Sequence, residues 1–199
     1  MPTRKAASGD LRQDLDEAYH TYERLSFMPQ PPDGPPLARW KAQGERAARV
    51  LLGMPSLPTM LLRLRDHLLR RQIPILPYLC ELLSTAVWRV FIGRYVTVGP
   101  GLIIPHGHVV IDGEVRIGRD CVINPWVTIG LSASWHSGLD TRGATIGDRV
   151  FIGTGAKILG AVTVGDDVRI GANAVVVDDV PSGATAVGAP ARVIERSER

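Results

Sequence analysis

Cysteine and aromatic residues are scarce in this sequence, and both shortages narrow the possible classes of protein. Only 2 of the 199 residues are cysteine, and Cys80 and Cys121 lie in apolar surroundings without the spacing of a metal-binding pair. They are expected to be buried thiols of a reducing compartment. Aromatic residues make up 6% of the chain, against 21 glycines and 15 prolines. This balance favours short strands and turns over a helical bundle.

Long apolar runs and strong charge are also missing. The most apolar stretch, residues 73–92, contains Glu81, Arg89 and two prolines, so it is a poor membrane span. The first ten residues are polar and unlike a secretory signal. The net charge is only +3, and the densest arginine group, at 63–71, has a helical pattern typical of a solvated face. We therefore expect a cytoplasmic protein that binds neither membranes nor nucleic acid.

Residues 1–90 have the pattern of a helical N-terminal segment. Residues 28–36 are too rich in proline for a helix or strand and are predicted to form a stiff connector. Apolar residues recur at helical spacing in 11–27, 37–53, 58–72 and 75–91. Because nothing here suggests catalysis, this segment is expected to pack against copies of itself or to cap the second half of the chain.

From Ile92 onward the sequence repeats every six residues, with two interruptions. An aliphatic residue marks each repeat, glycine often follows it, and a small or β-branched residue usually stands four positions after it. The recurring aliphatic residues are Ile92, Val98, Ile104, Ile111, Ile117, Ile123, Ile129, Ile146, Ile152, Ile158, Val164, Ile170 and Val176.

This period predicts a left-handed parallel β-helix of hexapeptide repeats over residues 91–194, followed by a polar tail at 195–199. Three hexads make one triangular turn, and the aliphatic side chains stack inside it at the strand spacing of about 4.8 Å. An α-helix needs a period near 3.6 and tolerates such a density of glycine poorly. The helices can cap one end of the coil, residues 181–199 can cap the other, and the flat faces favour association about a threefold axis.

The interruptions are the best functional clues, because insertions in a regular coil emerge as loops. The first is at residues 105–110. His106 stands two places after Ile104 and is expected to project outward, whereas His108 is four places after it and is expected to lean inward.

The second interruption, residues 131–145, is long enough to form a substrate wall on a rigid coil. It contains Trp135, His136, Asp140 and Arg142.

Several short stretches together resemble the hexapeptide-repeat acyltransferases and, within them, the serine O-acetyltransferase family. The similarity runs from about residue 74 to 194. Its most specific parts are 101–106 (GLIIPH), 113–114 (GE), 127–130 (VTIG), 152–160 (IGTGAKILG) and 187–194 (VGAPARVI).

The resemblance implies acetyl transfer from acetyl-CoA to a hydroxyl acceptor, first of all L-serine, in cysteine biosynthesis. His106 matches the family's general base, and a backbone N–H would stabilise the thioester oxygen. CoA would lie in the groove between two neighbouring coils of a homotrimer, which can pair into a dimer of trimers, and no metal is expected. The residues that match the family's CoA contacts are Gly130, Thr154, Ala172, Pro190 and Arg192.

The acceptor side matches the family only in part. Family members have an aspartate where this chain has Pro105, another in place of Phe91, and a histidine in place of Gly143. Arg142, which contacts the acceptor carboxylate in the family, is kept. We place Glu114 and His136 beside it on the acceptor side. The group that orients His106 stays open between Glu114, Asp112 and Asp140.

Two other interpretations stay open. The missing aspartates permit a sugar or specialised metabolite as acceptor. The coil could also be a scaffold for assembly without catalytic activity, or hold a metal between His106, His108 and His136, as in the γ-class carbonic anhydrases. The histidine spacing of that class differs from the spacing in this chain. The family's tail that docks on cysteine synthase typically ends in isoleucine, whereas this chain ends Glu198-Arg199, so that partner is not expected.

Overall fold

The computed structural model describes residues 57–131, 133–134, 138–139 and 141–194. Two helices, α3 (Leu57–Arg70) and α4 (Leu76–Trp88), precede the strands. They confirm the helices predicted over 58–72 and 75–91. The predictions for 11–27, 28–36, 37–53 and 195–199 fall outside the described residues, as does His136. No helix in the described part of the chain is long and apolar enough to cross a membrane.

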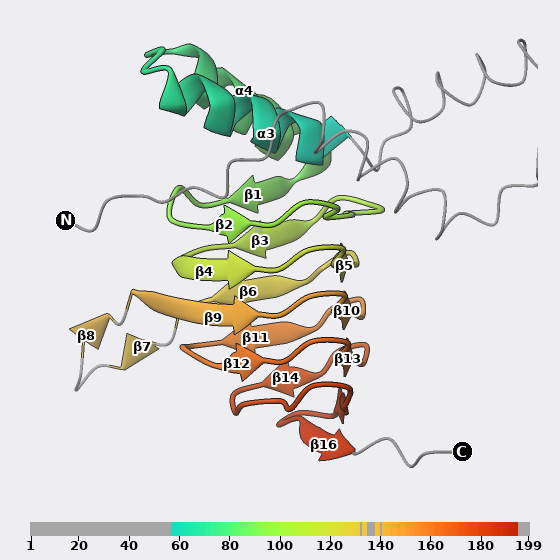
Figure 1. The fold of residues 1–199 in the computed structure, drawn as a ribbon. Helices are drawn as coiled ribbons and strands as arrows, with labels where there is room; N and C mark the ends of the chain where they lie inside the picture. The colour runs from blue at the N-terminus through green and yellow to red at the C-terminus, as the bar shows by residue number, and fades with distance from the viewer. Residues whose placement is uncertain (1–56, 132, 135–137, 140, 195–199) are drawn as a thin grey trace, which may run out of the picture.

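The strands wind into a coil with three parallel faces (Figure 1). The A face holds β1 (Val90–Ile92), β3 (Val109–Ile111), β6 (Thr128–Gly130), β11 (Lys157–Leu159) and β14 (Val175–Val176). The B face holds β2 (Thr97–Val98), β4 (Glu114–Ile117), β9 (Arg142–Ile146) and β12 (Thr163–Val164). The C face holds β5 (Val122–Ile123), β10 (Phe151–Ile152), β13 (Arg169–Ile170) and β15 (Thr185–Val187). The chain passes from A to B to C in each turn. The corner at which it leaves one face and enters the next is called an edge here, so the coil has an A–B edge, a B–C edge and a C–A edge.

The aliphatic residues of the repeat stack in register inside the coil. On the A face Ile129 pairs with Ile111 on one side and with Ile158 on the other. All the aliphatic residues that mark the repeat are at most 6% exposed. Burial removes their apolar surface from water at about 25 cal/mol per Å². The core predicted from the six-residue period is therefore confirmed.

Helices α3 and α4 lie across the first turn of the coil (Figure 1). Two arginines of α3 reach its backbone: Arg63 donates to the carbonyls of Val98 (2.8 Å) and Gly99 (2.5 Å), and Arg65, only 3% exposed, donates to the Ile92 carbonyl. These contacts satisfy carbonyl groups at an end of the coil that has no further turn to pair with.

The opposite end is closed by a reversal of the chain. The last strand, β16 (Arg192–Ile194), runs antiparallel to β15 and pairs Thr185 with Ile194. It thereby covers one free edge of the final turn. Both caps expected from the sequence are present in the described residues.

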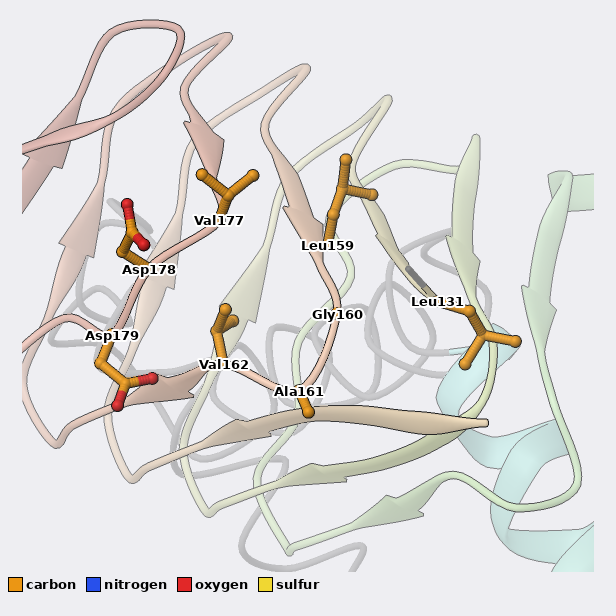
Figure 2. Close-up of a pocket in the computed structure, with 8 residues that line it drawn as sticks. All are labelled: Leu131, Leu159, Gly160, Ala161, Val162, Val177, Asp178 and Asp179. Atoms are coloured by element: carbon orange, nitrogen blue, oxygen red, sulfur yellow. The ribbon is translucent and has the colours of Figure 1, made fainter. Parts of the chain in front are cut away.

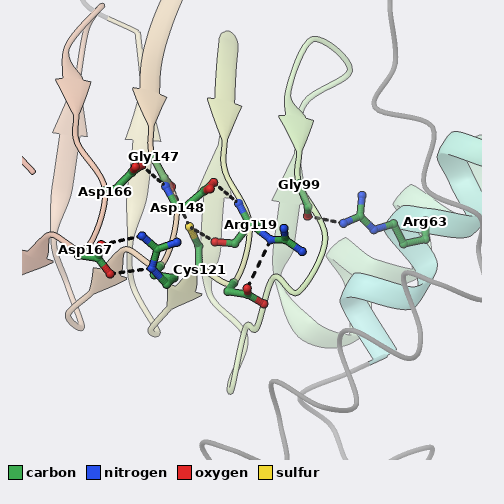
Figure 3. Close-up of polar contacts among 10 residues, drawn as sticks. Arg63, Gly99, Arg119, Cys121, Gly147, Asp148, Asp166 and Asp167 are labelled. Carbon is green, nitrogen blue, oxygen red and sulfur yellow. Dashed lines mark hydrogen bonds and ion pairs between the residues drawn. The ribbon is translucent and has the colours of Figure 1, made fainter.

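Acidic side chains tie successive turns together along the B–C edge (Figure 3). Asp148 accepts from the backbone N–H of Arg119 (2.8 Å), and Asp166 accepts from that of Asp148 (2.7 Å). Beneath this edge the Cys121 thiol is buried and donates to the Gly147 carbonyl (3.2 Å). Burial raises the pKa of Cys121 to about 11, so the thiol is protonated at neutral pH. Both cysteines are free and buried, as predicted.

Candidate functional site

His106 lies exposed on the C–A edge, in the turn that leads from Ile104 into β3. Backbone bonds anchor this turn to the end of α4: the N–H of His108 donates to the Trp88 carbonyl (3.0 Å), and that of Val109 donates to the Arg89 carbonyl (3.1 Å). The prediction that His106 projects outward is confirmed. Its imidazole stands on a fixed piece of backbone and is open to solvent.

The prediction that His108 leans inward is wrong. His108 is exposed, and its backbone is in the left-handed region (φ 66°). Val109, which is 0% exposed, takes the inward position instead. The reason is the extra residue of this turn, which falls before Val109 and moves His108 onto the corner. There its ring stacks on Trp126, with ring centroids 4.1 Å apart.

Two of the predicted CoA contacts lie on the same edge as His106. Backbone hydrogen bonds join the successive corners of this edge. The N–H of Trp126 donates to the His108 carbonyl (2.8 Å), and the N–H of Gly155 donates to the Pro125 carbonyl (2.9 Å). One turn further, the N–H of Asn173 donates to the Thr154 carbonyl (2.8 Å). Thr154 and the neighbour of Asn173, Ala172, are both exposed. They therefore continue the line that begins at His106.

Two of the predicted acceptor residues meet on the A–B edge. Glu114 begins β4, Arg142 begins β9, and the two are register partners. The Thr141 hydroxyl donates to Glu114 Oε1 (3.3 Å), and both Glu114 and Arg142 are exposed. Asp112 lies on this edge as well, where its carboxylate accepts from the N–H of Gly113 (2.9 Å). Asp140, like His136, is outside the described residues.

The A–B edge also carries a groove of about 760 Å³ (Figure 2). Leu131, Leu159 and Val177 form its apolar walls, and Asp178 and Asp179 stand at one end. Gly130, another predicted CoA contact, directly precedes Leu131 and pairs in register with Leu159. Sequence reasoning missed this groove because its residues come from three successive turns. The apolar walls suit an elongated, uncharged part of a ligand.

The remaining predicted CoA contacts lie at the end of the coil. Pro190 follows a cis peptide bond after Ala189, and Arg192 begins β16, where it pairs with Val187. Both side chains are exposed.

The two edges bound the A face on opposite sides, with a whole strand between them. His106 precedes β3, whereas Asp112 and Glu114 follow it. One chain therefore does not bring His106 together with Glu114 and Arg142. Within the described residues, no group of three or more His, Cys, Asp or Glu side chains is placed to hold a metal ion.

Comparison with known proteins agrees with this geometry. Residues 143–178 match the family model described as bacterial transferase hexapeptide (six repeats). A serine acetyltransferase of Helicobacter pylori (strain J99) is 41% identical over 160 residues, which cover 77% of this chain and 92% of that protein. The chain belongs to the serine acetyltransferase family. This membership confirms the resemblance to hexapeptide-repeat acyltransferases.

Other members of the family are longer. A Synechococcus elongatus serine acetyltransferase is 40% identical over 150 residues, but this chain spans only 60% of its length. Soybean serine acetyltransferase complexed with serine has a TM-score of 0.72 at 28% identity, covering 92% of this chain and 69% of that chain. The Brucella abortus (strain S19) serine acetyltransferase in complex with coenzyme A has a TM-score of 0.67 at 25% identity, covering 94% and 67%. These likenesses support the predicted left-handed β-helix.

Proposed function

We propose that this chain transfers the acetyl group of acetyl-CoA to the hydroxyl of L-serine, with His106 as general base. The observation that supports this proposal most is that His106 stands exposed on the same edge as Thr154 and Ala172, where CoA is predicted to lie. Serine and coenzyme A are bound by the soybean and Brucella relatives, which supports the same pair of ligands here.

His106 takes the proton of the serine hydroxyl as that oxygen attacks the thioester carbonyl carbon. Imidazole suits this step because it titrates near neutral pH when free in water. Negative charge then develops on the thioester oxygen, where a backbone N–H donor stabilises it. When the tetrahedral intermediate collapses, the carbon–sulfur bond breaks and the imidazolium returns its proton to the leaving CoA thiolate. The products are O-acetylserine and CoA.

A complete site needs two chains. The base lies on the C–A edge and the acceptor residues lie on the A–B edge, so we place the site where the C–A edge of one chain faces the A–B edge of the next. A ring closed about a threefold axis repeats this contact in every chain. CoA then runs between Thr154 and Ala172 of one chain and Gly130 of the other, with Pro190 and Arg192 near its nucleotide end. Residues 91–194 are the catalytic domain in this proposal.

A second contact surface supports pairing of such trimers. Helix α4 and its N-cap residue Ile75 expose a row of large apolar side chains that packing on α3 and the first strand leaves uncovered. The row consists of Ile75, Leu76, Tyr78, Leu79, Leu82, Leu83 and Val87. An apolar surface of this kind favours burial against another helix, so hexamers that join through the helical end fit the proposal.

Thiol release from acetyl-CoA tests the proposed function. We expect CoA to appear at a rate that depends on serine concentration, with O-acetylserine formed in equal amount. A panel of sugars and other hydroxylated amino acids is the control. Release stimulated only by one of these acceptors would instead support the acetylation of another metabolite. The absence of the family's aspartates at positions 105 and 91 permits such a change of acceptor. Failure of every acceptor in the panel to stimulate release would contradict an O-acetyltransferase.

Arg142 gives a test of the acceptor side. Replacing Arg142 with alanine is expected to raise the KM for serine about 30-fold and to leave the KM for acetyl-CoA within twofold, because a guanidinium–carboxylate contact contributes about 2 kcal/mol. Arg116 is a matched control, since it is an exposed arginine of the neighbouring strand β4. Arg116→Ala should leave both constants near the wild-type values. An unchanged serine KM in Arg142→Ala would remove this residue from the acceptor site.

A further inference from the structure

A stacked aromatic pair lies on the C–A edge beside the His106 turn, and the mechanism above does not use it. The pair consists of the His108 imidazole and the Trp126 indole, with centroids 4.1 Å apart and planes inclined by 26°. Trp126 keeps 59% of its surface exposed. A tryptophan left this open on a rigid coil, rather than packed in the core, has its aromatic face available for a ligand.

The position of the indole is fixed from several sides. The Trp126 backbone N–H donates to the His108 carbonyl (2.8 Å), and Lys157 Nζ donates to the Trp126 carbonyl (2.6 Å). Both aromatic residues have the left-handed backbone of this corner, with φ of 66° and 65°. His108 covers one side of the indole and holds the ring in place.

The next turn of the coil has a residue without a side chain at the corner position equivalent to Trp126. The equivalent corner position there is Gly155, at φ 74°. The Asn173 side chain fills the space beside this glycine, since a Cβ at Gly155 would lie 2.0 Å from Asn173 Oδ1. No Cβ of Gly155 stands beside the indole, and more than half of the Trp126 surface stays open to solvent.

Trp126 lies between the base and the predicted line of CoA. It follows the His106 turn by one turn of the coil, and the Thr154 hydroxyl donates to the carbonyl of its neighbour Pro125 (2.8 Å). Along the edge the order is thus His106, Trp126, Thr154 and Ala172. A donor whose thioester meets His106 and whose arm follows Thr154 must pass the indole. Methylene and amide groups pack well on an aromatic face, by dispersion.

We propose that Trp126, held by His108, binds the thioester end of the pantetheine arm and so positions acetyl-CoA for attack. This inference rests on the proposed function. It assigns to the donor side a residue pair that the general-base mechanism leaves without a role.

The test compares Trp126→Ala with Trp126→Phe. Trp126→Ala should raise the KM for acetyl-CoA and the Kd for CoA about tenfold, which equals about 1.4 kcal/mol and lies within the range of an aromatic contact. Trp126→Phe keeps an aromatic face and should stay within about threefold of wild type. The serine KM should not change in either variant. Phe151→Ala is the control, since Phe151 is an aromatic residue that is 45% exposed and lies in β10 on the C face, on neither of the two edges that form the site. It should change nothing.

A truncated donor locates the contact. With S-acetylpantetheine, which lacks the nucleotide, the loss in kcat/KM for Trp126→Ala should persist at about tenfold, whereas any loss caused by Arg192→Ala should disappear. A CoA Kd equal to that of wild type, or a change confined to the serine KM, would overturn the inference.

Calorimetric titration of CoA needs no acceptor, so it separates the two proposals. A wild-type chain that binds CoA but does not acetylate serine contradicts the proposed function and leaves the Trp126 comparison valid. A wild-type chain that binds no CoA overturns both.

Discussion

Replacing His106 with alanine is expected to lower kcat for serine acetylation by about three orders of magnitude, the range attributed to a positioned general base. The Kd for CoA should stay within twofold, because the exposed ring is not needed to hold Thr154 and Ala172 in place. The thermal unfolding midpoint should also be unchanged. Steady-state kinetics, calorimetry and a melting curve make the comparison. His67→Ala, in the last turn of helix α3 and outside the coil, is the control histidine.

Mixing two impaired variants tests where the site is assembled, provided that serine is held well below its KM, where the Arg142→Ala variant is slow as well. In our proposal His106 and Arg142 of one site come from different chains. Trimers that form at random from His106→Ala and Arg142→Ala chains therefore contain about one intact site in four, and should recover about a quarter of the wild-type rate. A site made within one chain would leave every site defective, and the mixture would then be no more active than the average of the two variants. Retention of activity by the His106→Ala variant alone would rule out His106 as the base.

The period of the sequence was sufficient to predict the core but not the corners. Stacking in register demands the same kind of side chain at every sixth position, so Ile152 and Ile170 can be recognised without knowing their neighbours. At a corner with one inserted residue, the six-residue spacing no longer tells which side chain points inward. Counting four places forward from Ile104 predicts that His108 is inside, whereas counting two places back from Ile111 correctly gives Val109, which is 0% exposed.

The candidate site was harder to predict for a related reason. The residue types at His106 and Arg142 point to their chemistry, but the distance between them depends on which edge each interruption occupies. That placement follows from the order of faces along the chain, which the structure shows directly. The His108–Trp126 pair depends on contact across one turn of the coil, between positions 18 residues apart on the corner column. A pattern of single residues does not reveal such a contact, although two aromatic residues at equivalent corners would be a usable signal.

Replacing Ile129 with alanine is expected to lower the free energy of unfolding by about 3–4 kcal/mol, the upper part of the range for a large-to-small change in a core. Ile129 is 0% exposed and lies in the middle of the A face, with Ile111 and Ile158 stacked on either side. Hydrogen-bonded strands on both sides limit how far the backbone can collapse into the cavity, so most of the lost packing is not recovered.

Urea unfolding at one fixed protein concentration measures the loss, because association of chains makes apparent stability depend on concentration. Ile129→Val is the graded control and should cost about 1 kcal/mol, since it removes one methyl group and keeps the β-branched shape. The same ordering should appear at Ile158, which has the equivalent place one turn further along the A face. A loss below about 1 kcal/mol for the alanine variant would mean that the turns do not stack as one continuous core, because only a loosely packed interior absorbs a cavity at so small a cost.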